Sequence, residues 1–408
     1  MRRPLAALPA LAVLALAVVA PAQAASAAET ESRSGPVVRF ATFNASLNRT
    51  LDGELVADLS TPADPQAANV AEIVQRSRPD VVLINEFDYD AQGTALDLFQ
   101  DNYLSVPHNG AASIDYPFHY TAPSNTGVPS GFDLNNDGTV GGPDDALGFG
   151  FFPGQFGMAV YSKYPIGDVR TFQEFLWKDM PGALLPDDLS TLEPADWFSP
   201  AELEVVRLSS KSHWDLPLTV DGQTVHLLTS HPTPPVFDGE EDRNGRRNSD
   251  EIRLWADYVD PARSGYIYDD AGQTGGLPAG ARFVIEGDQN SDPRDGDSIP
   301  GAAQQLLNSP RVNATRPPDS LGAVRASRAQ GGANLTHTNP DRHDTADFSD
   351  TDPGNLRVDY VLPSRGIGII RTAVFWPTPE SPLFRLTGDG SFPAPSSDHR
   401  LVWADLRF

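Results

Sequence analysis

The chain of 408 residues carries 30 Lys and Arg against 55 Asp and Glu, which gives a formal net charge of −25 at pH 7 and a pI near 4.5. This acidity excludes a protein that holds nucleic acid mainly through a basic surface, because that mode of binding sets Lys and Arg against the phosphates. A hydrophobic share of 39% excludes a largely disordered chain, and a sequence without cysteine excludes disulfides, a thiol nucleophile and a cysteine-ligated metal.

The first 27 residues have the organisation of a secretory signal peptide. Arg2 and Arg3 precede an apolar run over residues 5–20, and small residues follow up to Ala27. Prolines at positions 4, 9 and 21 argue against an uncleaved anchor, since a membrane span needs about 20 mainly apolar residues. We therefore expect residues 1–27 to be removed and residues 28–408 to form a secreted, extracellular protein with no stable membrane anchor.

Short apolar runs separated by Gly- and Pro-rich segments follow along the rest of the chain. They predict strands at 37–43, 81–85, 158–162, 225–230, 283–286, 358–362 and 401–406, and helices at 67–77, 250–259 and 302–307. The mixed order favours an α/β sandwich over a strictly alternating barrel. The segments 265–280 and 319–350 are rich in Gly, Ala, Asp and Asn, which predicts long surface loops within a single domain over 28–408.

Most of the predicted strands end in, or contain, a polar side chain that can bind a metal or transfer a proton. The set comprises Asn44, Glu86, His231, Asp288, Asn290, Asp359, Asp398 and His399. A rigid sheet can hold such groups within a few ångströms of one another, so convergence of these strand ends would build a metal and acid–base site. Any one of these residues alone would be a weak signal.

Three of the segments are specific enough to carry a resemblance: Gly287-Asp288-Gln289-Asn290, residues 357–362 and Ser397-Asp398-His399. Together, and in this order, they resemble the endonuclease/exonuclease/phosphatase superfamily of metal-dependent phosphoesterases. The resemblance runs from about residue 37 to the end of the chain. It implies a four-layer α/β sandwich, in which two packed mixed β-sheets are flanked by helices and the site lies at one edge.

The resemblance also implies a metal site. Glu86 would be the principal carboxylate ligand of Mg²⁺ or Mn²⁺, because such hard cations prefer oxygen ligands. Asn44 and Asp398 would complete or support that site. The sequence departs from the family pattern at Asn85, where Gln is frequent, and at Glu286, where an apolar residue is frequent, but neither departure removes a ligand.

The catalytic roles implied by the resemblance fall on five further residues. Asp288 would position and deprotonate the attacking water, and Asn290 would hold a phosphate oxygen. His399, oriented by Asp359, would donate a hydrogen bond to the phosphoryl group. His231 would act on the leaving group or on the phosphate.

A second metal candidate is an insert at 131–145 that resembles the calcium loops of dockerins and EF-hands. Its candidate ligands are Asp133, Asn135 and Asp137 at alternating positions, the carbonyl of Thr139, and Asp144 at the twelfth position. Gly131 and Pro143 exclude the flanking helices of an EF-hand. The motif predicts a structural Ca²⁺ at residues 133–144, and the alternative is a turn rich in Asp and Asn.

The segment 231–248 follows the candidate catalytic His231 and concentrates charges and turns. We interpret it as a substrate-facing loop in which Arg243, Arg246 or Arg247 clamps a phosphate. The alternative is a solvated loop whose arginines pair with its own acids.

These patterns predict a secreted, divalent-metal-dependent phosphoesterase that hydrolyses phosphate mono- or diesters by metal-assisted attack of water. Its partner would be a phosphate-ester substrate, either a small molecule or a nucleic acid, and the protein would be a monomer. The alternative is an extracellular endonuclease acting on DNA or RNA, and a non-catalytic binding protein on the same fold is a less favoured hypothesis. Motifs for serine hydrolases, phosphate-binding P-loops and zinc proteases are not found in the sequence.

Overall fold

The computed structural model describes Met1 and residues 35–408. By their internal contacts, residues 37–408 form one compact unit, distinct from Met1–Pro36. Apart from Met1, the expected signal peptide lies outside the described residues, so its prediction stays a prediction. Within the described part of the chain, the helices are all too short or too polar to cross a membrane.

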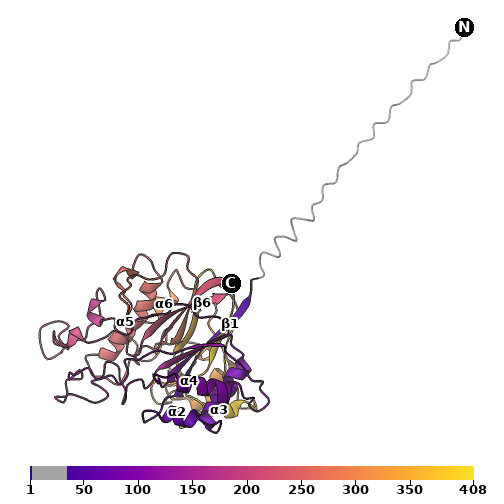
Figure 1. The fold of residues 1–408 in the computed structure, drawn as a ribbon, viewed down its shortest axis with the longest axis horizontal. Helices are drawn as coiled ribbons and strands as arrows, with labels where there is room; N and C mark the ends of the chain where they lie inside the picture. Colours follow the sequence, from indigo (N-terminus) through magenta and orange to yellow (C-terminus); the bar gives the residue numbers. More distant parts are fainter. Residues whose placement is uncertain (2–34) are drawn as a thin grey trace. The chain divides into compact units, whose positions relative to one another are not determined.

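Two β-sheets form the centre of the molecule (Figure 1). The first has six strands in the order β10-β11-β1-β2-β4-β3, and the second has five in the order β5-β6-β7-β8-β9. Both sheets are mixed, because β1 runs parallel to β2 and β7 runs parallel to β8. The strands are β1 (Val37–Leu47), β2 (Val81–Phe87), β3 (Phe118–Tyr120), β4 (Met158–Ser162), β5 (Arg170–Thr171), β6 (His213–Val220), β7 (Gln223–Ser230), β8 (Phe283–Asp288), β9 (Asp359–Pro363), β10 (Gly368–Val374) and β11 (Val402–Arg407).

Helices cover the outer face of each sheet, which makes four layers. In Figure 1, α2, α3 and α4 lie together below the sheets, and α5 and α6 lie on the opposite side. The helices are α2 (Glu54–Leu59), α3 (Pro65–Ser77), α4 (Thr94–Phe99) with a π-helical turn at Gln100–Leu104, α5 (Arg243–Tyr258), α6 (Gln304–Leu307) and α7 (Leu321–Gln330). Short 3₁₀ turns lie at Trp177–Asp179, Glu202–Glu204, Ser264–Tyr266, Gly332–Leu335, Asp341–His343 and Phe384–Leu386.

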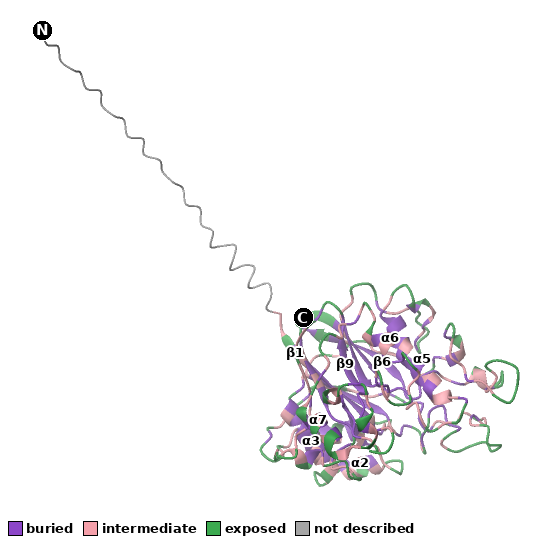
Figure 2. Cartoon of the chain, turned by 180° about the vertical axis from the view of Figure 1, so that it is seen from behind, coloured by how far each residue is buried: buried purple, intermediate pink, exposed green. Residues whose placement is uncertain are grey.

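Three apolar clusters hold the layers together, and their buried strands appear in purple in Figure 2. Phe40 and Leu83 of the first sheet meet Leu227 and Val284 of the second in the central cluster. The outer clusters join α2, α3 and α4 to the first sheet, and α5 and α6 to the second. Burial of apolar area on both faces of each sheet is the main stabilising term of such a sandwich. The predicted four-layer α/β sandwich is therefore confirmed.

Local sequence explains why α3 begins and ends where it does. The Asp64 side chain accepts a hydrogen bond from the Ala67 amide at 2.7 Å, and Pro65 occupies the first helical position. Apolar residues then recur on the face turned to the sheet, and the helix ends at Arg78 in a left-handed conformation. This helix also reaches the candidate site, because the Gln66 amide binds the Ser46 carbonyl at 2.8 Å.

The seven predicted strands and three predicted helices are present, but two loop predictions are wrong. The segment 319–350 contains α7, and its Ala346 forms β-bridges to Leu356 and to His399. The segment 231–248 is a loop only as far as Asp242, because α5 begins at Arg243 and not at residue 250. The first two turns of α5 bury polar residues that bind neighbouring loops, so they carry no apolar periodicity that would reveal a helix.

Candidate active site

The two parallel strand pairs bring their carboxyl ends together at one edge of the sandwich. Asn44 and Glu86 lie near the ends of β1 and β2, and Asp288 ends β8 in the other sheet. The Asn44 side-chain amide lies 3.1 Å from Glu86 Oε1 and 3.1 Å from Asp288 Oδ2. One buried asparagine thus connects both sheets at the candidate site.

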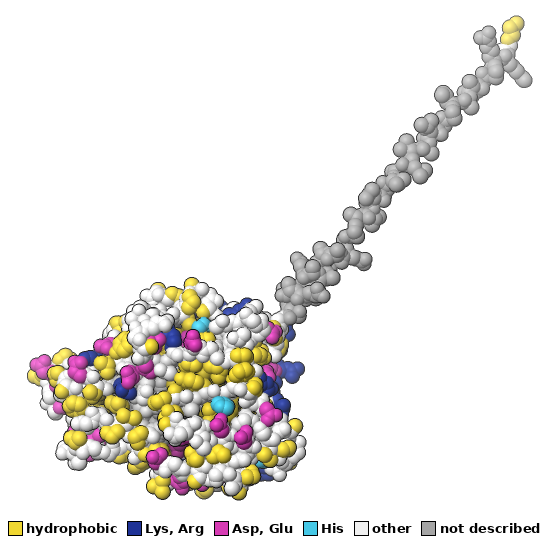
Figure 3. Space-filling model, viewed as in Figure 1, with side chains coloured by type: hydrophobic (Ala, Val, Ile, Leu, Met, Phe, Trp, Pro, Cys, Tyr) yellow, Lys and Arg dark blue, Asp and Glu magenta, His cyan; other side chains and the backbone are white. Residues whose placement is uncertain are grey.

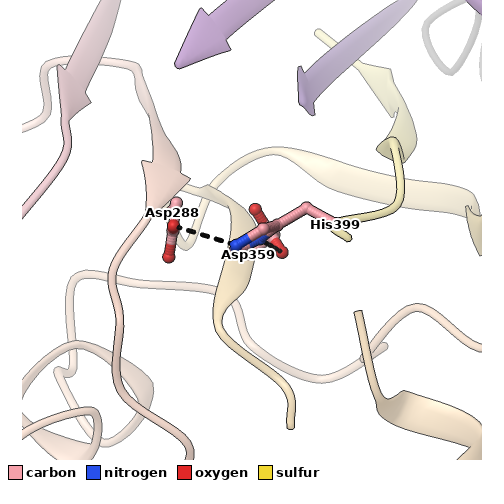
Figure 4. A group of neighbouring side chains, drawn as sticks. All are labelled: Asp288, Asp359 and His399. Atoms are coloured by element: carbon pink, nitrogen blue, oxygen red, sulfur yellow. Dashed lines mark hydrogen bonds and ion pairs between the residues drawn. The ribbon is translucent and has the colours of Figure 1, made fainter. Parts of the chain in front are cut away.

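Asp288, Asp359 and His399 form the densest cluster of this edge (Figure 4). His399 Nδ1 lies 3.0 Å from Asp359 Oδ2, and its Nε2 lies 3.6 Å from Asp288 Oδ2. Burial alone would lower the pKa of His399, but the carboxylates of Asp359 and Asp288 outweigh it and raise that pKa well above its usual range. The imidazole is therefore charged at neutral pH and can donate from Nε2 toward the cavity side of Asp288.

His231 approaches the same carboxylate from the end of β7. Its Nε2 lies 3.5 Å from Asp288 Oδ2, and the side chain is buried. Burial, followed by the charge of Lys211, lowers the pKa of His231 to about 4, so this imidazole is neutral at pH 7. The two histidines therefore differ in charge although both face Asp288.

Asp288 itself stays ionised. Burial would raise its pKa, but the charge of His399 and the contacts with His231 and Asn44 lower it below its usual range. A buried carboxylate with three donors around one oxygen is a pre-oriented hydrogen-bond acceptor, as a group that aims water must be. The backbone N–H of Asn290 also donates a hydrogen bond to Asp288 Oδ1 at 2.8 Å and helps to hold this carboxylate in place.

Glu86 and Asp398 provide the oxygen-rich side of the site. Burial, and then the charge of Asp398, raise the pKa of Glu86, and the backbone of Glu86 is left-handed with a φ of 58°. Two carboxylates that repel each other are stabilised by a cation between them, and oxygen donors suit Mg²⁺ or Mn²⁺. Glu86 and Asp398 therefore suit a divalent cation, whereas Asn44 turns its NH₂ group to Glu86 and its oxygen to the Ser46 amide, which is a supporting position.

Among residues 35–408, the one group of three His, Asp or Glu side chains with ligand atoms within 4.8 Å of one another is Asp288, Asp359 and His399. Both ring nitrogens of His399 face carboxylates, Nδ1 that of Asp359 and Nε2 that of Asp288. The division into a metal side at Glu86 and a proton-transfer side at this group stays a prediction.

Asn85, the departure noted before Glu86, has a structural role. Its Oδ1 accepts a hydrogen bond from the Asp288 amide at 3.2 Å, and its Nδ2 lies 3.5 Å from the Ser230 carbonyl. The side chain thus links β2 of the first sheet to the ends of β7 and β8 in the second. An asparagine can make both contacts because it carries a donor and an acceptor.

Lys211 is a candidate site residue that sequence reasoning missed. The chain has three lysines, and two of them pair with acids: Lys163 with Asp80 at 2.9 Å and Lys178 with Glu204 at 2.5 Å. Lys211 has no ion pair within the described residues, although it is buried and lines the same cavity as Glu86, His231 and Asp288. Burial lowers its pKa, while the charges of nearby carboxylates oppose that shift. No sequence pattern marks this residue, because it lies in a polar stretch before β6.

Glu251 of α5 holds the loops of Lys211 and His231 in place. Its buried carboxylate accepts hydrogen bonds from the Ser210 amide at 2.7 Å through Oε1 and from the Thr233 amide at 2.6 Å through Oε2. One turn earlier, the side-chain amide of Asn248 donates to the carbonyls of Thr233 and Gln289 at 2.8 and 2.9 Å. The polar first half of α5 therefore fixes three loops of the site.

The arginines predicted to clamp a phosphate contact the protein itself in this structure, so the clamp stays a prediction. The Arg247 guanidinium is bound to backbone carbonyls, including that of Leu208 at 2.8 Å and that of Leu147 at 2.6 Å. Arg246 donates to the Glu241 carbonyl at 3.1 Å, and Arg243 pairs with the Glu241 carboxylate. Each of these arginines thus contacts the protein itself, as the alternative of internal pairing held.

In the calcium-like loop, the side chains of the first candidate ligands accept hydrogen bonds from the loop's own backbone. Asp133 accepts from the amides of Asp137 and Gly138 at 3.1 and 2.8 Å, and Asn135 Oδ1 accepts from the Asp137 amide at 3.1 Å. Asp137 in turn accepts from the Thr139 amide at 2.8 Å. At the far end, Asp145 binds the amides of Leu134 and Gly141, each at 2.7 Å, whereas Asp144 is exposed and lines the cavity. Calcium binding by this loop stays a prediction.

A cavity of about 1220 Å³ lies over all of these groups. Its lining contains Glu86, His231, Asp288, Asn290 and Asp398, together with Lys211, His399 and several phenylalanines. Asp359 does not line it, which agrees with a role in orienting His399 from behind. Six of the eight residues that sequence reasoning selected therefore share one cavity with the lysine that it missed, and Asn44 and Asp359 are not part of its lining.

The profile of the Endonuclease/Exonuclease/phosphatase family matches residues 41–399, and the chain belongs to this family. A search of curated proteins found no match. Solved structures of similar fold include an endonuclease/exonuclease/phosphatase from Beutenbergia cavernae, at 16% identity over 91% of this chain and 72% of that chain with a TM-score of 0.45. Sphingomyelinase C from Streptomyces griseocarneus matches at 17% identity over 91% and 99%, with a TM-score of 0.44. TDP2 from Caenorhabditis elegans matches at 17% over 95% and 80%, with a TM-score of 0.43.

Proposed function

We propose that this protein is a secreted, divalent-metal-dependent phosphoesterase that hydrolyses phosphate mono- or diesters by attack of water. One observation carries the proposal: the ionised Asp288 lies among Asn44, His231 and His399 on the floor of a cavity that Glu86 and Asp398 share. Membership of the family supports the same chemistry. Secretion rests on the signal-peptide pattern of residues 1–27.

The metal would be held by Glu86 and Asp398, with Asn44 beside them. When bound there, Mg²⁺ or Mn²⁺ would supply positive charge next to the oxygens of the phosphoryl group. The two carboxylates face the cavity and repel each other, and this repulsion favours a bound cation.

The remaining groups divide the work of proton transfer and charge stabilisation. Asp288 accepts the hydrogen bond of a water molecule and aims that water at phosphorus. The charged His399 donates from Nε2 to a phosphoryl oxygen, and Asp359 holds its ring through Nδ1. Lys211 places its ammonium group on the same phosphoryl group, and Asn290 lines the cavity beside it.

Turnover by the purified mature protein tests the proposal. The assay uses p-nitrophenyl phosphate, bis-p-nitrophenyl phosphate, plasmid DNA and RNA, each with Mg²⁺, Mn²⁺, Ca²⁺ or chelator. We expect hydrolysis of at least one ester that stops with chelator and returns with added metal. Hydrolysis that is unaffected by chelator would contradict the metal site, and a lack of turnover on every substrate would favour the non-catalytic alternative. Nicking of plasmid DNA would move the assignment to an extracellular endonuclease.

A further inference from the structure

The carboxylate of Asp398, one of the two candidate metal ligands, is held only loosely by its own contacts. Within residues 35–408, its hydrogen bonds are both long: Oδ1 lies 3.4 Å from the hydroxyl of Ser46 and 3.4 Å from that of Ser397. The residue is also exposed. Contacts of this length fix the direction of a side chain poorly. The position of the Asp398 carboxylate therefore depends on the backbone that carries it.

That backbone is held at three successive carbonyl groups. Arg400 Nη1 donates to the Ser397 carbonyl at 2.7 Å and to the His399 carbonyl at 3.1 Å. The backbone amide of Asp347 donates to the Asp398 carbonyl at 2.8 Å. Two residues, Arg400 and Asp347, thus fix the peptide groups on both sides of Asp398.

Arg400 and Asp347 are themselves joined in a buried ion pair. Arg400 Nη2 lies 2.7 Å from Asp347 Oδ2, and the exposed fractions of the two side chains are 1% and 2%. Figure 3 shows other Lys and Arg side chains at the surface of the molecule. The Arg400 guanidinium also lies over the ring of Trp376, 4.5 Å from its centroid. One planar guanidinium thus contacts two carbonyls, a carboxylate and the face of a ring.

Helix α7 holds the other oxygen of Asp347. The Gln330 side-chain amide donates to Asp347 Oδ1 at 2.6 Å, and the Asn355 side chain donates to Gln330 Oε1 at 2.8 Å. Both carboxylate oxygens of Asp347 therefore have a donor, so the carboxylate that orients Arg400 is itself fixed.

Stability alone does not account for this ion pair. Desolvation of two buried charges offsets much of their attraction, and apolar side chains of similar volume are often equally stable in such a position. Neither Arg400 nor Asp347 lines the cavity, so neither contacts a substrate bound there. Both contact the backbone of residues 397–399, which carries Asp398 and His399 into the cavity.

We propose that Arg400 and Asp347 are positioning residues, which set the direction in which Asp398 presents its carboxylate to a divalent cation. This proposal rests on the metal-dependent phosphoesterase function proposed above. The His399 ring is held separately by Asp359 through Nδ1, so loss of the Arg400–Asp347 pair acts mainly on the metal ligand. Residues that orient metal ligands typically account for about 10- to 100-fold in metal affinity.

Binding of Mn²⁺ to the mature chain, without substrate, tests the proposal. The variant Arg400→Met/Asp347→Leu removes both charges and so leaves neither of them buried without its partner. The matched control is Arg39→Met/Asp405→Leu: this pair is also 2.7 Å apart and its arginine lies 3.7 Å from the centroid of the Trp403 ring, but it does not line the cavity. Electron paramagnetic resonance of free Mn²⁺ measures Kd. We expect Kd to rise about tenfold in the first variant and to stay unchanged in the control. Equal Kd for all three proteins would overturn the proposal.

The variant Asp398→Asn separates positioning of this ligand from a general loss of structure. It identifies the Mn²⁺ that binds in the cavity, as distinct from any bound at residues 133–144. Combined with Asp398→Asn, the double substitution should raise Kd less than about twofold further, because the carboxylate that it misplaces is already gone. A further tenfold rise would overturn the proposal. If circular dichroism shows that the double variant does not fold, Arg400→Lys provides the same test, since an ammonium group lacks the planar fork.

Turnover then separates this proposal from the function on which it rests. With bis-p-nitrophenyl phosphate, we expect the Mn²⁺ concentration for half-maximal activity to rise about tenfold in Arg400→Met/Asp347→Leu, while kcat at saturating Mn²⁺ stays within about threefold of the wild type. A large fall in kcat without a change in that concentration would overturn the positioning role. A wild type that binds Mn²⁺ in the cavity but hydrolyses no ester would overturn the phosphoesterase function alone. A wild type that binds no Mn²⁺ there would overturn both.

Discussion

The floor and the mouth of the cavity are built in opposite ways. The floor consists of residues at the ends of central strands, and these are buried and hydrogen-bonded to one another. The mouth consists of residues on loops, and its aromatic side chains Phe149, Phe237 and Phe392 stand in water. A rigid sheet fixes the positions of groups that must act on a reacting atom, whereas loops supply surfaces whose shape and polarity select what enters. The difference teaches that reaction chemistry and substrate choice are encoded in separate parts of this chain.

Substitution at the floor should have the largest effect on turnover. Asp288→Asn keeps the shape of the side chain but removes the charge that orients water, so we expect kcat to fall on the order of 10³-fold or more. Steady-state kinetics with the best substrate of the panel measure this, and circular dichroism checks the fold. Asp101→Asn, a change at an exposed position, serves as the control. Near-normal turnover by Asp288→Asn would refute the assignment of the floor.

Removal of the lysine that sequence reasoning missed should have the next largest effect. Lys211→Met keeps the length and apolar stem of the side chain but removes the ammonium group. We expect kcat/KM to fall about 100-fold, because a charge-assisted contact to the phosphoryl group is lost. Lys211→Arg should recover part of this loss, and Lys163→Met, which removes a lysine paired with Asp80, should leave kcat/KM unchanged. Equal kcat/KM for Lys211→Met and the wild type would mean that the ammonium does not contact substrate.

Glu251 of α5 holds the loops of Lys211 and His231, and loss of its hydrogen bonds should have an intermediate effect. Glu251→Gln replaces one of two carboxylate oxygens by an NH₂ group, which then faces a backbone N–H. We expect the free energy of unfolding to fall by about 1–3 kcal/mol. We also expect kcat to fall about tenfold, since the loops of Lys211 and His231 lose their alignment. Urea unfolding and kinetics measure the two effects. A loss of stability without a loss of kcat would show that these loops keep their positions without the Glu251 hydrogen bonds.

The difference between strand ends and loops explains which site residues the sequence could predict and which it could not. Asn44, Glu86 and Asp288 follow apolar strands, so their convergence could be predicted from strand order alone. Lys211 could not be predicted in this way, because it enters the cavity through hydrogen bonds made by Glu251, which is 40 residues away in the chain. The start of α5 was missed for the same reason: its inner face is polar and is satisfied by loops instead of by an apolar core.

The sequence also could not reveal which charged side chains already have partners within the protein. Arg247 is indistinguishable from a phosphate clamp until the carbonyls around its guanidinium are seen. The segment 319–350 was wrongly predicted as a surface loop, although its Thr345 hydroxyl accepts a hydrogen bond from the Asp359 amide at 3.0 Å. Contacts between residues distant in the chain carry this information, and local composition does not.

Because His399 is charged, we expect the free energy of unfolding to depend on pH through this residue of the cavity floor. Its pKa in the folded protein is raised above the unfolded value of about 6.5, so its stabilising contribution is full below that value and is lost as the pH rises through the folded pKa. We expect the difference in unfolding free energy between the wild type and His399→Gln to shrink as the pH is raised from 6.5. Urea unfolding at several pH values, with chelator throughout, measures it. A difference that grows with pH would contradict a charged His399.

The smallest expected effect concerns the loop at 133–144, which adjoins the mouth through Asp144. Its acids already converge through hydrogen bonds to their own backbone, so a bound Ca²⁺ would replace few contacts and stabilise the fold only by mass action. We expect millimolar Ca²⁺ to raise Tm by a few degrees in the wild type but not in Asp133→Ala/Asp137→Ala. Mg²⁺ serves as the control cation, because the small, rigid coordination of Mg²⁺ fits such a loop poorly. An unchanged Tm with Ca²⁺ would show that the loop is a turn rich in Asp and Asn. Its own hydrogen bonds would then hold it in place without a metal ion.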